Sequence, residues 1–263
     1  MTQPDIFSRA TRRRFRDRAF ISDHDSRWLT RFITNELVDR LDLMQRQFDR
    51  VLIIGNDGGD LQRLIAPSGS LTLMADPSFR GAANTNGVQC DEDRLPFADA
   101  SFDLVLVPGG LDTVNDLPGA LVLIRRMLVA DGLFLGAMAG AGGLDTLRNI
   151  IAGTADPNRV VARHHPQIDV RGAGDLLTRA GFAQPVAESH NITARYPDLF
   201  KLIGDLRANA MTNALVERQP LRRDQIAQMA EQFVAAGNPK TEEIFSLIFM
   251  TGWATTARAP AAL

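Results

Sequence analysis

The amino-acid sequence predicts an α/β protein built on a doubly wound, mostly parallel sheet. From residue 50 onward, short apolar runs alternate with segments of helical spacing. The first four apolar runs are apolar on both faces, which is typical of parallel strands that are covered by helices on both sides. A helical lead precedes this alternation, and further helical segments interrupt it after residue 140.

Composition narrows the class of protein. The chain has 263 residues, 45% of them hydrophobic, and a net charge of −2. This length buries a large core and excludes a disordered chain. The single cysteine, Cys90, excludes a disulfide framework and favours a reducing compartment. The sequence shows neither an apolar run of about 20 residues nor a cleavable leader, so we expect a cytoplasmic protein without a membrane span. The near-neutral charge argues against a nucleic-acid partner.

The helical lead, residues 5–48, is basic at its start. Six arginines stand between Arg9 and Arg18, as in a transit peptide. Acidic residues enter at Asp17, however, and apolar residues recur at helical spacing from Trp28, so we expect a folded segment. Because arginine is abundant along the whole chain, we interpret the excess as coding bias and not as phosphate-binding chemistry.

The remaining elements are predicted from the spacing of apolar residues and from the turn residues between them. The predicted strands are 51–55, 71–76, 87–89, 102–107, 132–138, 184–195 and 244–251. The predicted helices are 58–66, 117–128, 144–153, 171–180, 197–217 and 222–236. Asp131-Gly132 is expected to stop the helix before the fifth strand. We divide the chain into a helical segment (1–48), an α/β core (49–140) and a part with cap helices and the end of the sheet (141–263).

Polar and glycine residues collect where the first three strands end. In an open parallel sheet, ligands bind beyond these carboxyl ends. The first strand leads into Gly55 and a loop whose following helix offers free N–H groups. Asp76 ends the second strand 21 residues later, a placement suited to accepting both hydroxyls of a ribose. Asp91 and Glu92 follow the third strand, where an acidic side chain can receive the amino group of adenine.

In this order and spacing, the elements resemble the class I S-adenosylmethionine (SAM)-dependent methyltransferases. The resemblance implies a seven-stranded Rossmann-like sheet with N-terminal helices and an inserted helical cap, and SAM as the cofactor. The cofactor-binding residues that it implies are Gly55, Asn56, Asp57, Gly59, Asp76, Pro77, Asp91, Glu92, Val107 and Pro108.

The resemblance can be narrowed. The runs Leu95-Pro96-Phe97, Val114-Asn115-Asp116 and Asp131 to Met138 look like the branch of the malonyl carrier-protein methyltransferase of biotin synthesis. Cap motifs such as Asp145-Thr146-Leu147-Arg148 and Thr251-Gly252-Trp253 look more like the complex I assembly factor that hydroxylates an arginine. This resemblance implies a SAM-dependent methyltransferase, or a SAM-using modifying enzyme of the same fold. Its acceptor would be a small molecule or a protein, such as a subunit of respiratory complex I.

Two departures keep a second hypothesis open. The family usually has an acidic residue two positions before the first glycine and a second glycine in the loop, where this chain has Ile53 and Asp57. Loss of one charge-assisted contact costs roughly 1.5–3 kcal/mol, or about ten- to a hundred-fold in affinity, so SAM binding would be weakened or lost. The alternative is a degenerate, non-catalytic assembly factor for respiratory complex I.

The sequence offers few candidate catalytic residues. His164 and His165 lie in a cap loop, where a solvent-facing role competes with a catalytic one. Tyr196 opens a cap helix, where packing competes with lining the site. We expect no metal, because no cluster of histidine, cysteine and acidic residues has ligand spacing. An NAD-binding protein is a more distant alternative, because the loop lacks the Gly-x-Gly-x-x-Gly spacing.

Overall fold

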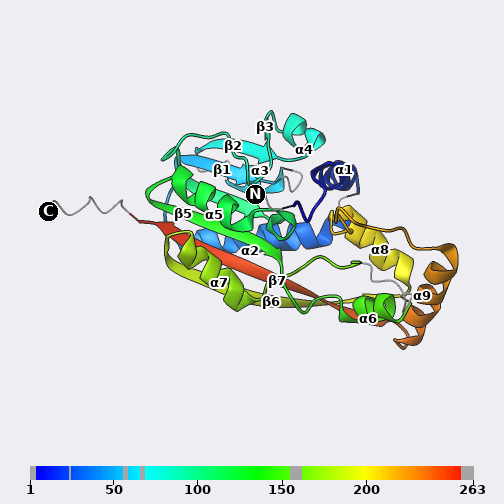
Figure 1. Cartoon of the computed structure of the whole chain (residues 1–263). Coiled ribbons are helices and arrows are strands. Elements are labelled where there is room, and N and C mark those ends of the chain that lie inside the picture. Colours follow the sequence, from blue (N-terminus) through cyan, green and yellow to red (C-terminus); the bar gives the residue numbers. More distant parts are fainter. Residues whose placement is uncertain (1–3, 24, 56–58, 66–68, 155–161, 256–263) are drawn as a thin grey trace.

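A computed structural model describes residues 4–23, 25–55, 59–65, 69–154 and 162–255. It contains a seven-stranded sheet in the order β3-β2-β1-β4-β5-β7-β6 (Figure 1). The strands β1 to β5 pair in parallel, and β7 lies antiparallel between β5 and β6. The strands are β1 Arg50–Ile54, β2 Leu71–Asp76, β3 Val88–Gln89, β4 Phe102–Pro108, β5 Leu128–Ala139, β6 Phe182–Tyr196 and β7 Thr241–Ala254. The predicted α/β architecture is confirmed.

The helices are α1 Arg9–Phe20, α2 Trp28–Leu43, α3 Asp60–Ile65, α4 Phe79–Asn84, α5 Leu117–Met127, α6 Asp145–Gly153, α7 Val170–Arg179, α8 Leu199–Ala208 and α9 Arg223–Ala235. Two predictions need correction. The helix expected over 197–217 ends at Ala208, and Ala210 then takes a φ of 56°. Asp131-Gly132 does not stop a helix, because α5 already ends at Met127; Asp131 lies inside β5 with a φ of 61°, where the pairing with β4 shifts register.

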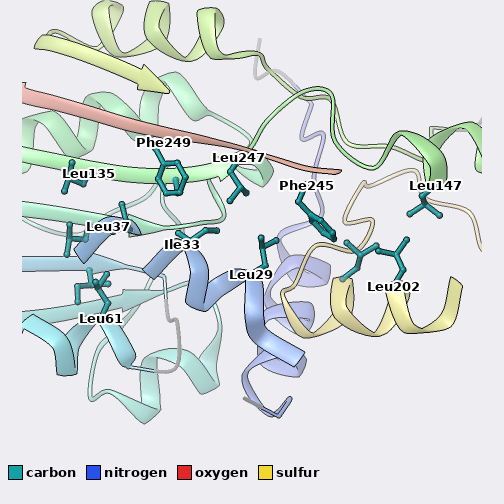
Figure 2. Packing of buried hydrophobic residues seen from close by; sticks show 14 of the residues in the cluster. Leu29, Ile33, Leu37, Leu61, Leu135, Leu147, Leu202, Phe245, Leu247 and Phe249 are labelled. Carbon is teal, nitrogen blue, oxygen red and sulfur yellow. The ribbon is translucent and has the colours of Figure 1, made fainter. Parts of the chain in front are cut away.

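Two apolar layers cover the sheet, because alternate residues of each buried strand point to opposite faces. In β1, Ile53 belongs to the layer under α2, whereas Leu52 and Ile54 belong to the layer under α5 and α7. Figure 2 shows the first layer, in which Leu29, Ile33 and Leu37 of α2 pack toward the sheet.

The cap stands on a long antiparallel pair. Strands β6 and β7 have 15 and 14 residues, against five in β1, so they extend beyond the parallel part of the sheet. Helices α6, α8 and α9 gather around this extension (Figure 1). Leu147 of α6, Leu202 of α8 and Phe245 of β7 continue the apolar layer of α2 into the cap (Figure 2). Phe245 and Phe249 lie in the core on β7, inside the strand predicted over 244–251.

Helix α1 lies beside α4 and α8, close to the carboxyl ends of the parallel strands (Figure 1). Ser8 caps its start by accepting the N–H of Thr11. The residue before this cap, Phe7, is held on both sides: its N–H donates to Asn115 Oδ1 at 2.8 Å, and its carbonyl accepts from Asn115 Nδ2 at 3.0 Å. These contacts fix α1 over the edge where the sequence predicts a ligand. Among the helices described, none has the length and apolar character needed to cross a membrane.

Candidate functional site

A cavity of about 100 Å³ opens at the carboxyl ends of β1, β2 and β4. Gly55 and Asp76 line it, together with the apolar side chains of Met138, Leu247 and Met211. Strands β1 and β4 are neighbours, while the chain runs outward from β1 through β2 and β3 before it returns to β4. The cavity therefore lies at the switch point of the sheet, where open α/β folds bind their ligands.

Asp76 is the most constrained polar group of this cavity. Its side chain is buried at the end of β2, and the Ser78 N–H donates to Oδ1 at 2.6 Å. Arg16 donates to the same carboxylate from Nη2 at 2.7 Å and from Nε at 3.3 Å. Burial by itself would raise the pKa of Asp76, but the Arg16 charge and the Ser78 N–H outweigh it and hold that pKa below its usual value. Asp76 is thus an ionised acceptor.

Asp91 and Glu92 follow β3, as predicted, and both are buried. Arg13 donates to Asp91 Oδ2 at 2.6 Å, while Oδ1 has no hydrogen-bond partner within the described part of the chain. Arg12 chelates Glu92 with two bonds of 2.6 Å and also donates to the Gly110 carbonyl. Neither acid lines the cavity, whereas Arg12, the partner of Glu92, does.

One face of α1 supplies every arginine in these pairs. Arg9, Arg12, Arg13 and Arg16 recur at i, i+3, i+4 and i+7, the spacing that aligns side chains on one side of a helix. Arg9 completes the row by donating to both oxygens of Asp93, at 2.6 and 2.7 Å. The structure gives this row a role in ion pairs, which the interpretation as coding bias had not assigned to it. The spacing itself was the signal that could have found it.

Two predicted features of the first loop have different outcomes. Gly55 has a φ of 102°, a backbone conformation that side chains rarely adopt, and lines the cavity. Asn56 and Asp57 lie outside the described residues. Gly59, with a φ of 82°, immediately precedes α3. Ile53 is fully buried in the core layer under α2. An apolar core residue therefore stands where the family usually has an acid.

The other predicted cofactor-site residues lie around this edge. Pro108 lines the cavity, whereas Val107 is fully buried in the layer under α5. The carbonyl of Pro77 accepts from Gln89 Nε2 at 3.1 Å, which joins the ends of β2 and β3. Cys90 is buried beside the acids, and burial raises the pKa of its thiol to about 12.

The three weak catalytic candidates do not line the cavity. His165 accepts the Ala214 N–H on Nε2 at 2.9 Å and packs against the Phe7 ring, so it supports the segment that leads into α1. Burial lowers the pKa of both His164 and His165. Tyr196 is the last residue of β6, not the first of a helix, and its hydroxyl donates to Asp205 at 3.2 Å.

Comparisons with known proteins agree with this geometry. A family model described as a methyltransferase domain matches residues 59–136. The YcgJ protein of Bacillus subtilis superposes with a TM-score of 0.58 at 15% identity, covering 86% of this chain and 100% of that one. Phosphoethanolamine N-methyltransferase 2 of Haemonchus contortus, solved with S-adenosylhomocysteine, gives 0.53 at 14% identity, covering 92% and 60%. At these identities the likeness supports the fold alone.

Proteins that are similar in sequence show the family as well as the fold. The mouse arginine-hydroxylase NDUFAF5, mitochondrial, is 30% identical over 240 residues, which are 86% of this chain and 70% of that protein. The malonyl-[acyl-carrier protein] O-methyltransferase of Laribacter hongkongensis is 30% identical over 222 residues, 77% and 73% of the two chains. The chain belongs to the class I SAM-dependent methyltransferase family. The predicted resemblance is confirmed, and these two relatives carry different activities in their names.

Proposed function

We propose that the chain is a SAM-dependent modifying enzyme of the methyltransferase type, acting on a small-molecule or protein acceptor. The observation that carries the proposal is Asp76: a buried, ionised carboxylate at the end of β2 that faces a cavity together with Gly55 at the end of β1. Such a carboxylate can accept both hydroxyls of a ribose. The relatives and the matched methyltransferase domain support SAM as the nucleoside.

The residues present fit the nucleoside part of this cofactor. Asp91 Oδ1 is a buried acceptor without a partner within the described residues. Asp91 follows β3, where the family resemblance implies an acceptor for the adenine amino group, although it does not line the cavity in the free protein. Gly81 lets α4 approach Asp76 closely, since a Cβ there would lie 2.7 Å from Asp76 Cγ. Bound SAM would supply an electrophilic methyl group. Transfer of that group depends mainly on placement, so the apolar lining residues Met138 and Leu247 would orient the acceptor and exclude water.

Calorimetric titration tests this proposal with S-adenosylhomocysteine and with SAM. We expect saturable binding to the native chain and a loss of about ten-fold or more in affinity for Asp76→Asn, because a neutral amide no longer offers two anionic acceptors. Asp99→Asn is the matched control, since Asp99 pairs only with the exposed Arg126 within the described part of the chain and neither residue lines the cavity. Absence of binding at millimolar ligand would overturn the proposal.

A second candidate function has its own observation. Arg12, Arg13 and Arg16 already occupy the acids that would hold the nucleoside. A non-catalytic assembly factor for respiratory complex I would keep such a closed site. It predicts no SAM binding together with co-purification of a complex I subunit from cells, whereas the enzyme predicts binding. We retain a complex I subunit as the proposed protein acceptor and the cytoplasm as the proposed compartment; the NDUFAF5 relatives are named mitochondrial.

A further inference from the structure

Of the arginines on this face of α1, Arg12 and Arg16 line the cavity, and the two differ in their hydrogen bonds. Arg12, one turn earlier, uses Nε, Nη1 and Nη2 in bonds to Thr113, Glu92 and Gly110. Among the residues that the structure describes, Arg16 bonds only to Asp76, through Nε and Nη2. Its Nη1 has no hydrogen-bond partner among the residues described, and its side chain lines the cavity. Arg16 therefore keeps donor capacity free on the side where a ligand would lie.

The guanidinium of Arg16 lies over the ends of two strands. A Cβ on Gly55 would lie 3.0 Å from Nη2, and a Cβ on Gly110 would lie 2.9 Å from Nη1. Glycine at both positions leaves the room that this side chain occupies. The acids that face Arg16 are Asp76, Asp112 and Glu92, and Arg12 already chelates the last of these.

A nucleoside that takes Asp76 must share or displace this arginine. The side chain of Arg16 is only 15% exposed, and a buried cation that loses its counter-charge is strongly unfavourable. A neutral ribose offers no negative charge in exchange. The exchange becomes favourable when the same ligand brings an anion to the guanidinium, since a carboxylate matches its fork of donors.

We propose that Arg16 exchanges its partner on binding: it pairs with Asp76 in the free protein and with the carboxylate of an S-adenosyl amino acid in the complex. This inference rests on the proposed function. It makes Arg16 a specificity-determining residue, because an adenosyl thioether without a carboxylate would displace the arginine from Asp76 and offer nothing in return. Arg16 would also add affinity for the amino-acid part of the ligand, to which Ile53 contributes no charged contact.

The test compares two ligands that differ only in the carboxylate: S-adenosylhomocysteine and its decarboxylated form, S-adenosyl-3-thiopropylamine. Affinities are measured by calorimetry on the native chain, on Arg16→Met and on Arg14→Met, whose side chain is exposed on the same helix. We expect the native chain to prefer the carboxylate by roughly ten-fold or more. Arg16→Met should reduce that preference to about three-fold or less, and Arg14→Met should retain it.

Each other outcome has a defined meaning. If Arg16→Met binds both ligands more tightly by the same factor, Arg16 only blocks the site and the inference is wrong. An unchanged preference in Arg16→Met also overturns it. If the native chain binds neither ligand, the proposed function fails as well. Thermal unfolding checks that Arg16→Met is folded; should it not be, Arg16→Lys takes its place, and we expect it to keep only part of the preference because ammonium lacks the paired donors.

Discussion

Asp76 and Glu243 are almost equally buried, at 2% and 1% exposure, but their pKa values shift in opposite directions. At the strand ends, Arg16 holds the pKa of Asp76 below its usual value. In the cap, burial raises the pKa of Glu243 to about 7. Oε1 of Glu243 accepts the Leu147 N–H at 2.7 Å, and its Oε2 has no partner among the residues described. Neighbouring Asp145 adds a repulsive charge.

The difference shows two ways of burying a carboxylate. At the strand ends, a single helix supplies a cation for each acid, so the charges are kept and remain available to a charged ligand. In the cap, no such cation faces Glu243 within the described residues, so the group accommodates burial by holding its proton. A region built from paired charges can exchange partners, whereas a neutralised carboxyl can only stabilise the packing around it.

The largest expected effect comes from a substitution that breaks an ion pair at the strand ends. Arg12→Met leaves Glu92, which is fully buried, without its two bonds of 2.6 Å. Removing one partner of a buried pair costs about 3–5 kcal/mol, so we expect a loss of that size in the free energy of unfolding, measured in urea. Arg14→Met, at an exposed position of the same helix, should stay within about 0.5 kcal/mol. A similar effect of both substitutions would contradict the paired-charge description.

The next prediction concerns Glu243 in the cap and the pH dependence of the free energy of unfolding. The pKa of Glu243 rises from 4.5 to about 7 on folding, so its contribution is complete below pH 4.5 and is lost as the pH rises through 7. Glu243→Gln imitates the protonated form. We expect this variant to gain on the native chain by up to about 3 kcal/mol between pH 5 and 8. Glu231→Gln, at an exposed position of α9, should show a flat difference, and a flat difference for both would overturn the assignment.

The sequence predicted the sheet because its signal is local. Runs such as Leu71–Asp76 are apolar and short, and the observed strand has the same ends. The predicted boundaries were wrong at two places where the local pattern suggests another structure. Asp131 adopts a positive φ inside a strand, and the residues after Ala208 have helical spacing but form no helix. A turn signal does not distinguish an irregularity within a strand from the end of a helix.

The candidate site divides in the same way. Strand ends and spacing predicted Asp76, which ends β2, and Asp91 and Glu92, which follow β3; of the three, only Asp76 lines the cavity. Their partners were not found, because Arg16 and Asp76 lie 60 residues apart and only the folded sheet brings α1 to them. A helix face made of arginines shows that something acidic or anionic is near, without showing what it is.

The smallest expected effect concerns the hydroxyl of Tyr196. It donates to Asp205 Oδ2 at 3.2 Å, and the same oxygen also accepts from Trp28 Nε1 at 2.9 Å. Asp205 also pairs with Lys201, so Tyr196→Phe leaves this buried acid with other partners. We therefore expect a loss of only about 0.5–1.5 kcal/mol in unfolding free energy. Affinity for S-adenosylhomocysteine should not change, because Tyr196 does not line the cavity. A ten-fold loss of affinity with intact stability would instead place Tyr196 in the functional site and join the two regions.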